Sequence, residues 1–145
     1  MTLGHLDLVK RALEQFDEAV VAVMVNAEKQ TLFDLQTRVE IAQRTVADLP
    51  RVRVISDTGM LIDLFDRLHA DAVCKGWRNE KDYDYEMWMA NWNREHNPNF
   101  RTVLLKSEGE HATLSSTQVR DRLQAGDSLA GLVHPAALPL ILPKA

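Results

Sequence analysis

The sequence predicts an α/β fold with a doubly wound, mostly parallel sheet. Short apolar runs alternate with amphipathic segments along the whole chain, and the apolar runs have the length of strands. The run AVVAVMV at residues 19–25 is continuously apolar, which is typical of a parallel strand covered on both faces. Regular alternation of strands and helices favours right-handed βαβ units and hence a mostly parallel sheet.

The expected elements follow one another without a linker or an internal repeat. The first helix has its apolar residues on one face: Leu6, Leu8, Val9, Leu13 and Phe16. Strands are expected at residues 19–25, 52–55, 70–75 and 102–105, and the helices between them near 35–48, 60–68 and 85–96, with a polar loop at 76–84. A helix capped by Ser115 or Ser116 follows, and a short final helix follows Pro135.

Composition limits the classes of function. The 145 residues, 46% of them hydrophobic, suit a single domain over residues 1–145 with a real core. The net charge of −4 gives no general attraction to nucleic acid or to anionic membranes. Cys74 is the only cysteine, so an intramolecular disulfide is excluded, and we expect a buried, inert thiol. No signal peptide or 20-residue apolar run is visible, and a cytoplasmic protein is therefore expected.

The N-terminal segment TLGH stands in an unusual place. A doubly wound domain normally begins with a strand that becomes central in the sheet. Here the first expected element is a helix, and Thr2, Gly4 and His5 occupy the position of the loop after a first strand. We therefore expect the sheet to lack its first, central strand.

Basic and hydroxyl side chains gather at the expected carboxyl ends of the strands, where α/β sheets bind ligands. They are Thr2 and His5, Lys29, Lys75 and Arg78, and Ser115, Ser116, Thr117 and Arg120. Helix N-termini with hydroxyl caps attract anions, so this edge of an acidic protein suits a polyphosphate ligand. Each feature alone also has a plainer interpretation, as a surface histidine, a solvated lysine or a simple helix cap. The residues Trp88, Met89 and Trp92 indicate core or a subunit interface rather than a cofactor site.

In order and spacing, TLGH, Lys29, KGWR with DYDYE, and LSSTQVR resemble the bacterial phosphopantetheine adenylyltransferases. The similarity runs from TLGH to GLVHPA, over essentially the whole chain. The outer motifs, (H/T)xGH and SSTxxR, mark a wider superfamily of nucleotidyltransferases. The middle motifs, KGWR and DYDYE in this chain, correspond to (K/R)GLR and D-(F/Y)-x-YE in the family. These motifs distinguish the phosphopantetheine adenylyltransferases from cytidylyltransferases and nicotinamide-mononucleotide adenylyltransferases.

The resemblance implies a Rossmann-like nucleotidyltransferase fold of the HUP type. The family also carries a G-(S/T)-F-D-P stretch on its first strand, just before TxGH, and this sequence does not contain it. Our hypothesis is that Met1 corresponds to an internal methionine. The two strands beside the missing one would then have unpaired edges, and the chain as given is expected to be poorly stable and nearly inactive.

By resemblance, the reaction joins ATP to 4′-phosphopantetheine and gives dephospho-coenzyme A and pyrophosphate, with Mg²⁺ accompanying the triphosphate and a homohexameric assembly. His5 would donate to the α-phosphate, and Lys29 would bridge the attacking phosphate and the α-phosphate. Lys75 would hold the phosphate of phosphopantetheine, Leu61 would touch its pantetheine arm, and Arg78 would contact the phosphates of ATP. The catalytic set implied is His5, Lys29, Lys75 and Arg78. The other residues implied to bind ATP are Gly76, Trp77, Glu86, His111, Ala112, Thr113, Leu114, Ser115, Ser116, Thr117 and Arg120.

Two departures from the family pattern affect the site: Trp77 replaces a usual leucine, and Lys75 replaces the arginine of many relatives. Three alternative functions stay open. One is a nucleotidyltransferase of the same superfamily with another phosphorylated acceptor. A second is a non-catalytic or defective nucleotide-binding protein, and a third is a flavodoxin-like response module, which would need an acidic rather than a basic pocket.

Overall fold

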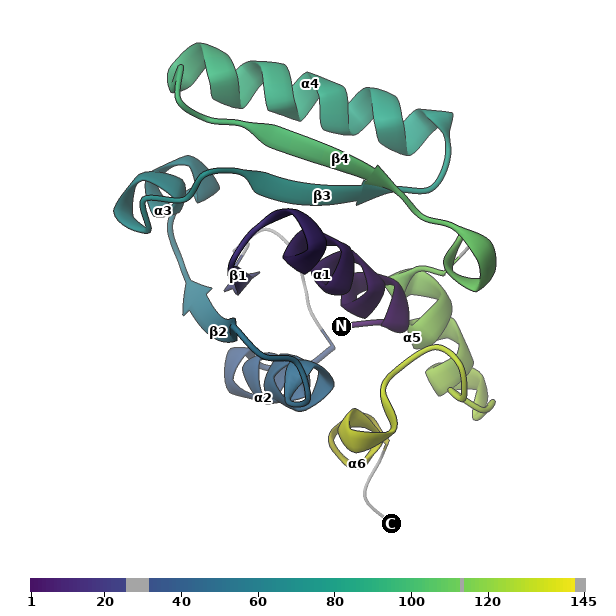
Figure 1. Cartoon of the computed structure of the whole chain (residues 1–145). Coiled ribbons are helices and arrows are strands. Elements are labelled where there is room, and N and C mark those ends of the chain that lie inside the picture. The colour runs from purple at the N-terminus through teal and green to yellow at the C-terminus, as the bar shows by residue number, and fades with distance from the viewer. Residues whose placement is uncertain (26–31, 113, 143–145) are drawn as a thin grey trace.

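The structure is a computed structural model that describes residues 1–25, 32–112 and 114–142, and it shows the predicted alternation of helices and strands (Figure 1). Its elements are α1 (Leu3–Gln15), β1 (Ala19–Met24), α2 (Leu35–Val46), β2 (Val52–Asp57), α3 (Leu61–Arg67), β3 (Val73–Trp77), α4 (Glu80–His96), β4 (Thr102–Lys106), α5 (Ser116–Ala125) and α6 (Leu138–Ile141). Short 3₁₀ turns lie at Gly109–His111 and Pro135–Ala137. No helix in the described part of the chain is long and apolar enough to cross a membrane.

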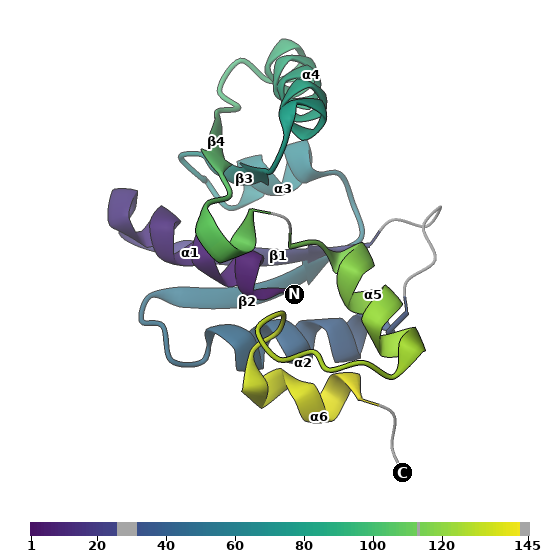
Figure 2. The ribbon, with the colours of Figure 1, turned by 90° about the vertical axis from the view of Figure 1, so that its right-hand side faces the viewer.

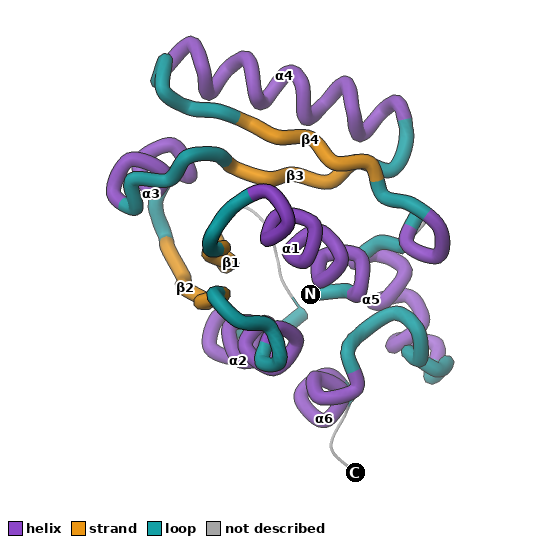
Figure 3. The backbone as a smooth tube through the Cα atoms, in the orientation of Figure 1, coloured by secondary structure: helices purple, strands orange, loops and turns teal. Residues whose placement is uncertain are grey.

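The four strands form two separate parallel pairs instead of one sheet. β1 pairs with β2, with Ala19 opposite Val52, and β3 pairs with β4, with Val73 opposite Thr102. Among the described residues, no ladder joins β1 to β3. Figure 3 shows the two pairs apart from each other and inclined to one another. All four strands are therefore edge strands among the described residues, and β1 and β3 each have one edge without a backbone partner in a sheet.

A cavity of about 1290 Å³ lies between the two pairs. Every residue of β1 lines it, from Ala19 to Met24, and so do Val73 to Gly76 of β3. The prediction that β1 is a buried strand covered on both faces is consequently wrong, because all of its residues are only half-buried. The cavity lies where a central first strand was expected from the sequence.

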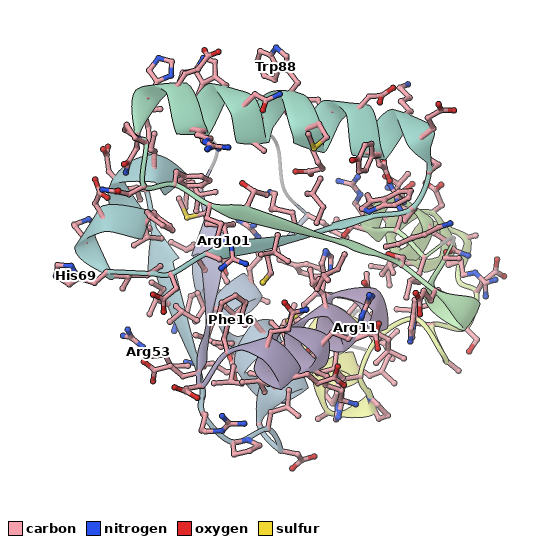
Figure 4. All side chains as sticks on the ribbon, turned by 45° about the horizontal axis from the view of Figure 1, so that its top comes forward. Arg11, Phe16, Arg53, His69, Trp88 and Arg101 are labelled. Atoms are coloured by element: carbon pink, nitrogen blue, oxygen red, sulfur yellow. The ribbon has the colours of Figure 1, made fainter. Side chains whose placement is uncertain are left out.

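The main core lies beside this cavity, between α2 and the C-terminal segment, in the lower half of Figure 2, and its members Ile41, Val133 and Ile141 also line the cavity. Its buried members are Ile41, Leu114, Leu129, Leu132, Val133, Ala137 and Ile141. The Leu3 N–H donates to the Leu132 carbonyl at 2.8 Å, which attaches the first turn of α1 to this core. At the other end of α1, the Arg101 guanidinium lies 6.0 Å from the centre of the Phe16 ring (Figure 4).

The segment between β3 and α4 corrects the predicted boundaries. β3 continues through Gly76 and Trp77, because these residues pair with Leu105 and Lys106 of β4. α4 begins at Glu80 rather than at residue 85, so most of the expected loop is helical. The Asn79 side chain caps the helix by accepting from the backbone N–H of Asp82 at 2.9 Å. Acidic residues in the first turn also suit the positive end of the helix dipole.

Candidate active site

The TLGH segment forms a capping box at the start of α1. Thr2 Oγ1 accepts from the His5 N–H at 3.4 Å, and His5 Nδ1 accepts from the Thr2 N–H at 3.0 Å. This arrangement normally places Glu or Gln at the third helical position, and here a histidine occupies it. Thr2 is only 4% exposed, so the box holds the His5 ring in a fixed orientation at the cavity.

His5 is a neutral imidazole in this structure. His5 lines the cavity and keeps solvent-exposed surface, yet neighbouring protein atoms partly enclose its ring and desolvate it. This enclosure is the largest cause that lowers the pKa of His5, to about 4, and the N-terminal amine, Arg78 and Lys75 lower it further. The hydrogen bond that Nδ1 accepts from Thr2 points in the same direction, because it requires an unprotonated Nδ1. At neutral pH the ring is therefore a hydrogen-bond donor and not a cation.

Gly4 allows a second segment to pack against this first turn. A Cβ at Gly4 would lie 3.4 Å from Thr2 Oγ1, 3.6 Å from a Leu114 methyl group and 3.9 Å from the His111 Cβ. The described residues His111 and Leu114 therefore pack against the first turn of α1. Leu114 itself belongs to the buried core, and His111 Nδ1 is buried with no hydrogen-bond partner within the described residues.

Two basic side chains lie in or just after β3, Lys75 within the strand and Arg78 directly after it, and each has a carboxylate partner. Lys75 Nζ lies 4.0 Å from a Glu86 carboxylate oxygen. Arg78 Nε donates to Asp82 Oδ2 at 2.8 Å, within the i,i+4 pair that the start of α4 creates. Both pairs are partly exposed, so they cost little to break when a phosphate competes for the cation.

Trp77 lies on β3 and not in a loop. Its ring makes an edge contact with Tyr83 at 5.0 Å between centroids, and Lys106 Nζ lies 5.3 Å from its centre. Trp77 therefore fixes the beginning of α4 and a neighbouring cation, and it does not line the cavity. The implied role of Trp77 in contacting ATP stays a prediction.

The start of α5 supplies hydroxyl and amide groups to the same region. Ser115 is the helix cap, and its Oγ accepts from the Gln118 N–H at 3.1 Å. Among the described residues, the N–H groups of Ser116 and Thr117 have no hydrogen-bond partner. Arg120 donates to Thr117 Oγ1 at 3.2 Å, which brings its guanidinium to the same turn. Free first-turn amides beside an arginine favour an anion.

The cavity brings many, though not all, of the predicted residues together. Seven of them line it: His5, Leu61, Lys75, Gly76, Glu86, Ser116 and Arg120. Seven other predicted residues lie outside the lining: Trp77, Arg78, His111, Ala112, Leu114, Ser115 and Thr117. Lys29 and Thr113 lie outside the described residues. Among the other lining residues are Thr2, whose T-x-x-H spacing carries the signal of a capping box, and Arg38, for which the sequence has no distinguishing signal.

Comparison with known proteins identifies the family. Residues 1–122 match the model of the cytidylyltransferase-like family. The chain is 37% identical over 144 residues to the phosphopantetheine adenylyltransferase of Clostridium kluyveri, a match that covers 99% of this chain and 88% of the relative. The enzyme of the same name from Nocardioides sp. is 40% identical over 136 residues, covering 94% of this chain and 85% of the relative. The chain belongs to the phosphopantetheine adenylyltransferase family. The resemblance drawn from TLGH, KGWR and LSSTQVR is thereby confirmed.

As a member of the phosphopantetheine adenylyltransferase family, the chain combines the outer motifs of a nucleotidyltransferase with one cavity. The match to the relative from Caldanaerobacter subterraneus, 35% identical, again covers 99% of this chain and 90% of the relative. TLGH and LSSTQVR lie 100 residues or more apart in sequence, and His5, Ser116 and Arg120 nonetheless line the same space. The individual roles implied for these residues stay predictions.

Proposed function

We propose that the chain transfers the adenylyl group of ATP to 4′-phosphopantetheine and releases pyrophosphate. One observation carries the proposal. A neutral imidazole, an ammonium group and the start of α5 with its arginine all line one cavity, where His5, Lys75 and Arg120 lie. Relatives called phosphopantetheine adenylyltransferase support the choice of acceptor, since they align with almost the whole chain.

The proposed reaction is a direct displacement at phosphorus. An oxygen of the phosphopantetheine phosphate attacks the α-phosphorus of ATP, a new P–O bond forms, and the bond to the β-phosphate breaks. Pyrophosphate leaves with the electron pair of that bond, so no protein nucleophile is required. Cys74 does not supply one, because burial raises the pKa of its thiol. Catalysis then depends on positioning and on stabilising charge in the transition state.

The residues at the cavity fit these two tasks. The His5 imidazole donates to a non-bridging oxygen of the α-phosphate as negative charge builds there. Lys75 binds the phosphate of phosphopantetheine, and the first turn of α5 with Arg120 receives the β- and γ-phosphates. Lys29, by resemblance, bridges the two reacting phosphates. ATP is taken as its Mg²⁺ complex, since Mg²⁺ usually binds through substrate phosphates.

The experiment is a pyrophosphate-release assay with ATP and a panel of acceptors. We expect turnover with 4′-phosphopantetheine and none with nicotinamide mononucleotide or glycerol phosphate. Turnover with one of those two alone would replace our acceptor and keep the reaction class. ATP binding without pyrophosphate release from any acceptor would favour a non-catalytic nucleotide-binding protein.

Replacing Lys75 by alanine is expected to raise the KM for phosphopantetheine by about tenfold or more, with a much smaller effect on the KM for ATP. The physical reason is the loss of one charge-assisted contact, worth about 1.5–3 kcal/mol. Steady-state kinetics with each substrate varied in turn measures the split. Lys75→Arg is the matched control, because it keeps the charge and adds a bidentate donor set. Unchanged acceptor affinity in Lys75→Ala would refute the assignment.

We also propose that the chain assembles as a homohexamer through α4. Tyr85 and Trp88 are 60% and 59% exposed, and their rings stack with centroids 6.4 Å apart. Figure 4 shows Trp88 on the outer side of α4, pointing away from the strands. An exposed aromatic pair of this kind is typical of a subunit interface.

The assembly is tested by sedimentation velocity. We expect a hexamer for the wild-type chain and smaller species for Trp88→Ser, while Met60→Ser serves as a control, because Met60 is an exposed apolar residue outside both α4 and the cavity lining. A monomeric wild type, or a hexamer that Trp88→Ser leaves intact, would contradict the role of α4. We further propose a cytoplasmic location; the single cysteine, which forms no intramolecular disulfide, supports it, and cell fractionation tests it.

A further inference from the structure

The capping box at TLGH constrains the protons of the His5 ring. The Thr2 backbone N–H can only donate a hydrogen bond, and its nitrogen lies 3.0 Å from His5 Nδ1. Nδ1 must therefore present its lone pair, and a neutral ring then carries its proton on Nε2. A protonated ring would set two N–H groups against each other and break the box.

The Thr2 hydroxyl reinforces the same arrangement. Its oxygen accepts from the His5 backbone N–H at 3.4 Å and lies 3.1 Å from Nδ1. A hydroxyl can accept one hydrogen bond and donate another, so it can cap the helix and donate to Nδ1 together. With Nδ1 engaged, Nε2 is the ring nitrogen left for a ligand in the cavity that His5 lines.

The charged groups around His5 favour the same protonation state. The N-terminal amine, Lys75 on β3 and Arg78 just after it all act electrostatically on the ring. Arg120 of α5 lines the same cavity, as does Glu86 of α4, whose carboxylate is paired with Lys75. The Asp82 carboxylate, also on α4, is paired with Arg78. The segment over α1 adds His111, which packs near Gly4. Cations outnumber carboxylates in this set, and so a second positive charge on the ring is disfavoured.

We propose that Thr2 is a positioning residue that holds His5 as the neutral tautomer with the proton on Nε2, aimed at the transferring phosphate. The inference rests on the proposed function only for the identity of the phosphate, because the tautomer is a property of the free protein. In this proposal Lys75 and Arg120 supply positive charge to the phosphates, and His5 supplies a directed hydrogen bond to the transferring phosphate.

The first test is long-range ¹H–¹⁵N correlation spectroscopy of the full chain labelled with ¹⁵N-histidine. We expect a pyridine-type Nδ1 and a protonated Nε2 for His5, unchanged as the pH falls from 8 to 5, since its pKa is about 4. A ring protonated on Nδ1, or one that titrates near its ordinary pKa of 6.5, would overturn the proposal. This measurement needs no substrate, so its result is independent of the reaction that the chain catalyses.

The second test uses Thr2→Asp, with Thr2→Ser as the matched control. Aspartate is as good a helix cap as threonine, so α1 is retained, but its carboxylate can only accept and it attracts a proton to Nδ1. We expect a raised pKa for His5, an acid limb in the pH profile that moves to higher pH, and kcat lowered by about tenfold or more with KM for ATP little changed. Thr2→Ser keeps the hydroxyl and should behave as wild type. A Thr2→Asp protein with wild-type tautomer, pKa and pH profile would reduce Thr2 to a structural cap.

Discussion

His5→Ala is expected to lower turnover by about 10²–10³-fold while the affinity for ATP changes little. The reason is that the imidazole N–H meets charge that develops on the α-phosphate only in the transition state, and losing one such donor costs about this much. Single-turnover kinetics together with equilibrium ATP binding separates the two quantities. An equal loss of ATP affinity would show that His5 binds the ground state and would contradict the role.

The control for this change is His5→Gln. Glutamine is one of the two residues that normally complete a capping box, so the first turn of α1 should keep its cap. Its amide cannot reproduce the Nε2–H at the position that the imidazole provides. If His5→Ala and His5→Gln lose turnover alike, the loss comes from the missing donor. If His5→Gln retains wild-type turnover, the histidine acts only through the cap.

A strand added before Met1 is expected to stabilise the chain and to raise its activity. The proposed addition is an apolar strand of about six residues that ends in G-S-F-D-P, the family stretch that TLGH lacks. Such a strand would pair with the free edges of β1 and β3 and would cover apolar side chains that line the cavity. Burying these side chains should raise the melting temperature by about 5–10 °C. Hydrogen exchange of the β1 and β3 amides should slow as well.

The matched control is an added Gly/Ser segment of the same length, which has no apolar side chains to bury. We expect neither the rise in melting temperature nor the slower exchange from it. Equal pyrophosphate release by the chain with and without the added strand would mean that the strand is dispensable. If neither the chain as given nor the chain with the added strand released pyrophosphate, another acceptor or a non-catalytic role would be favoured.

The same pair of proteins tests a pH effect at Met1. Burial, and then Arg38, lower the pKa of the Met1 amine from its ordinary value of 8.0. The unfolded chain therefore binds more protons than the folded one just below that pH, so the free energy of unfolding should fall as the pH drops below 8.0. The added strand turns the amine into a peptide group, and the difference between the two proteins should lose this dependence.

Much of the fold was predictable because periodicity and caps are local signals. The alternation of apolar runs and amphipathic segments predicted each strand and helix in order, and Ser115 was one of the two residues expected to cap α5. The errors came where pairing with another strand decided a boundary. β3 extends through Trp77 because β4 lies beside it, and Asn79 then starts α4 earlier than the apolar pattern indicates.

The sequence by itself determined the family, since TLGH, KGWR and LSSTQVR carry recognisable residues at fixed spacing. It also supplied the predicted site residues, of which seven line one cavity. Only the tertiary structure decided which of those residues share a cavity and in what state. It pairs Lys75 of β3 with Glu86 of α4, and it makes His5 a neutral donor. It also separates the strands into two pairs around a cavity. Contacts between distant segments and the solvent around a charge are properties of the packed chain, and no local pattern of residues encodes them.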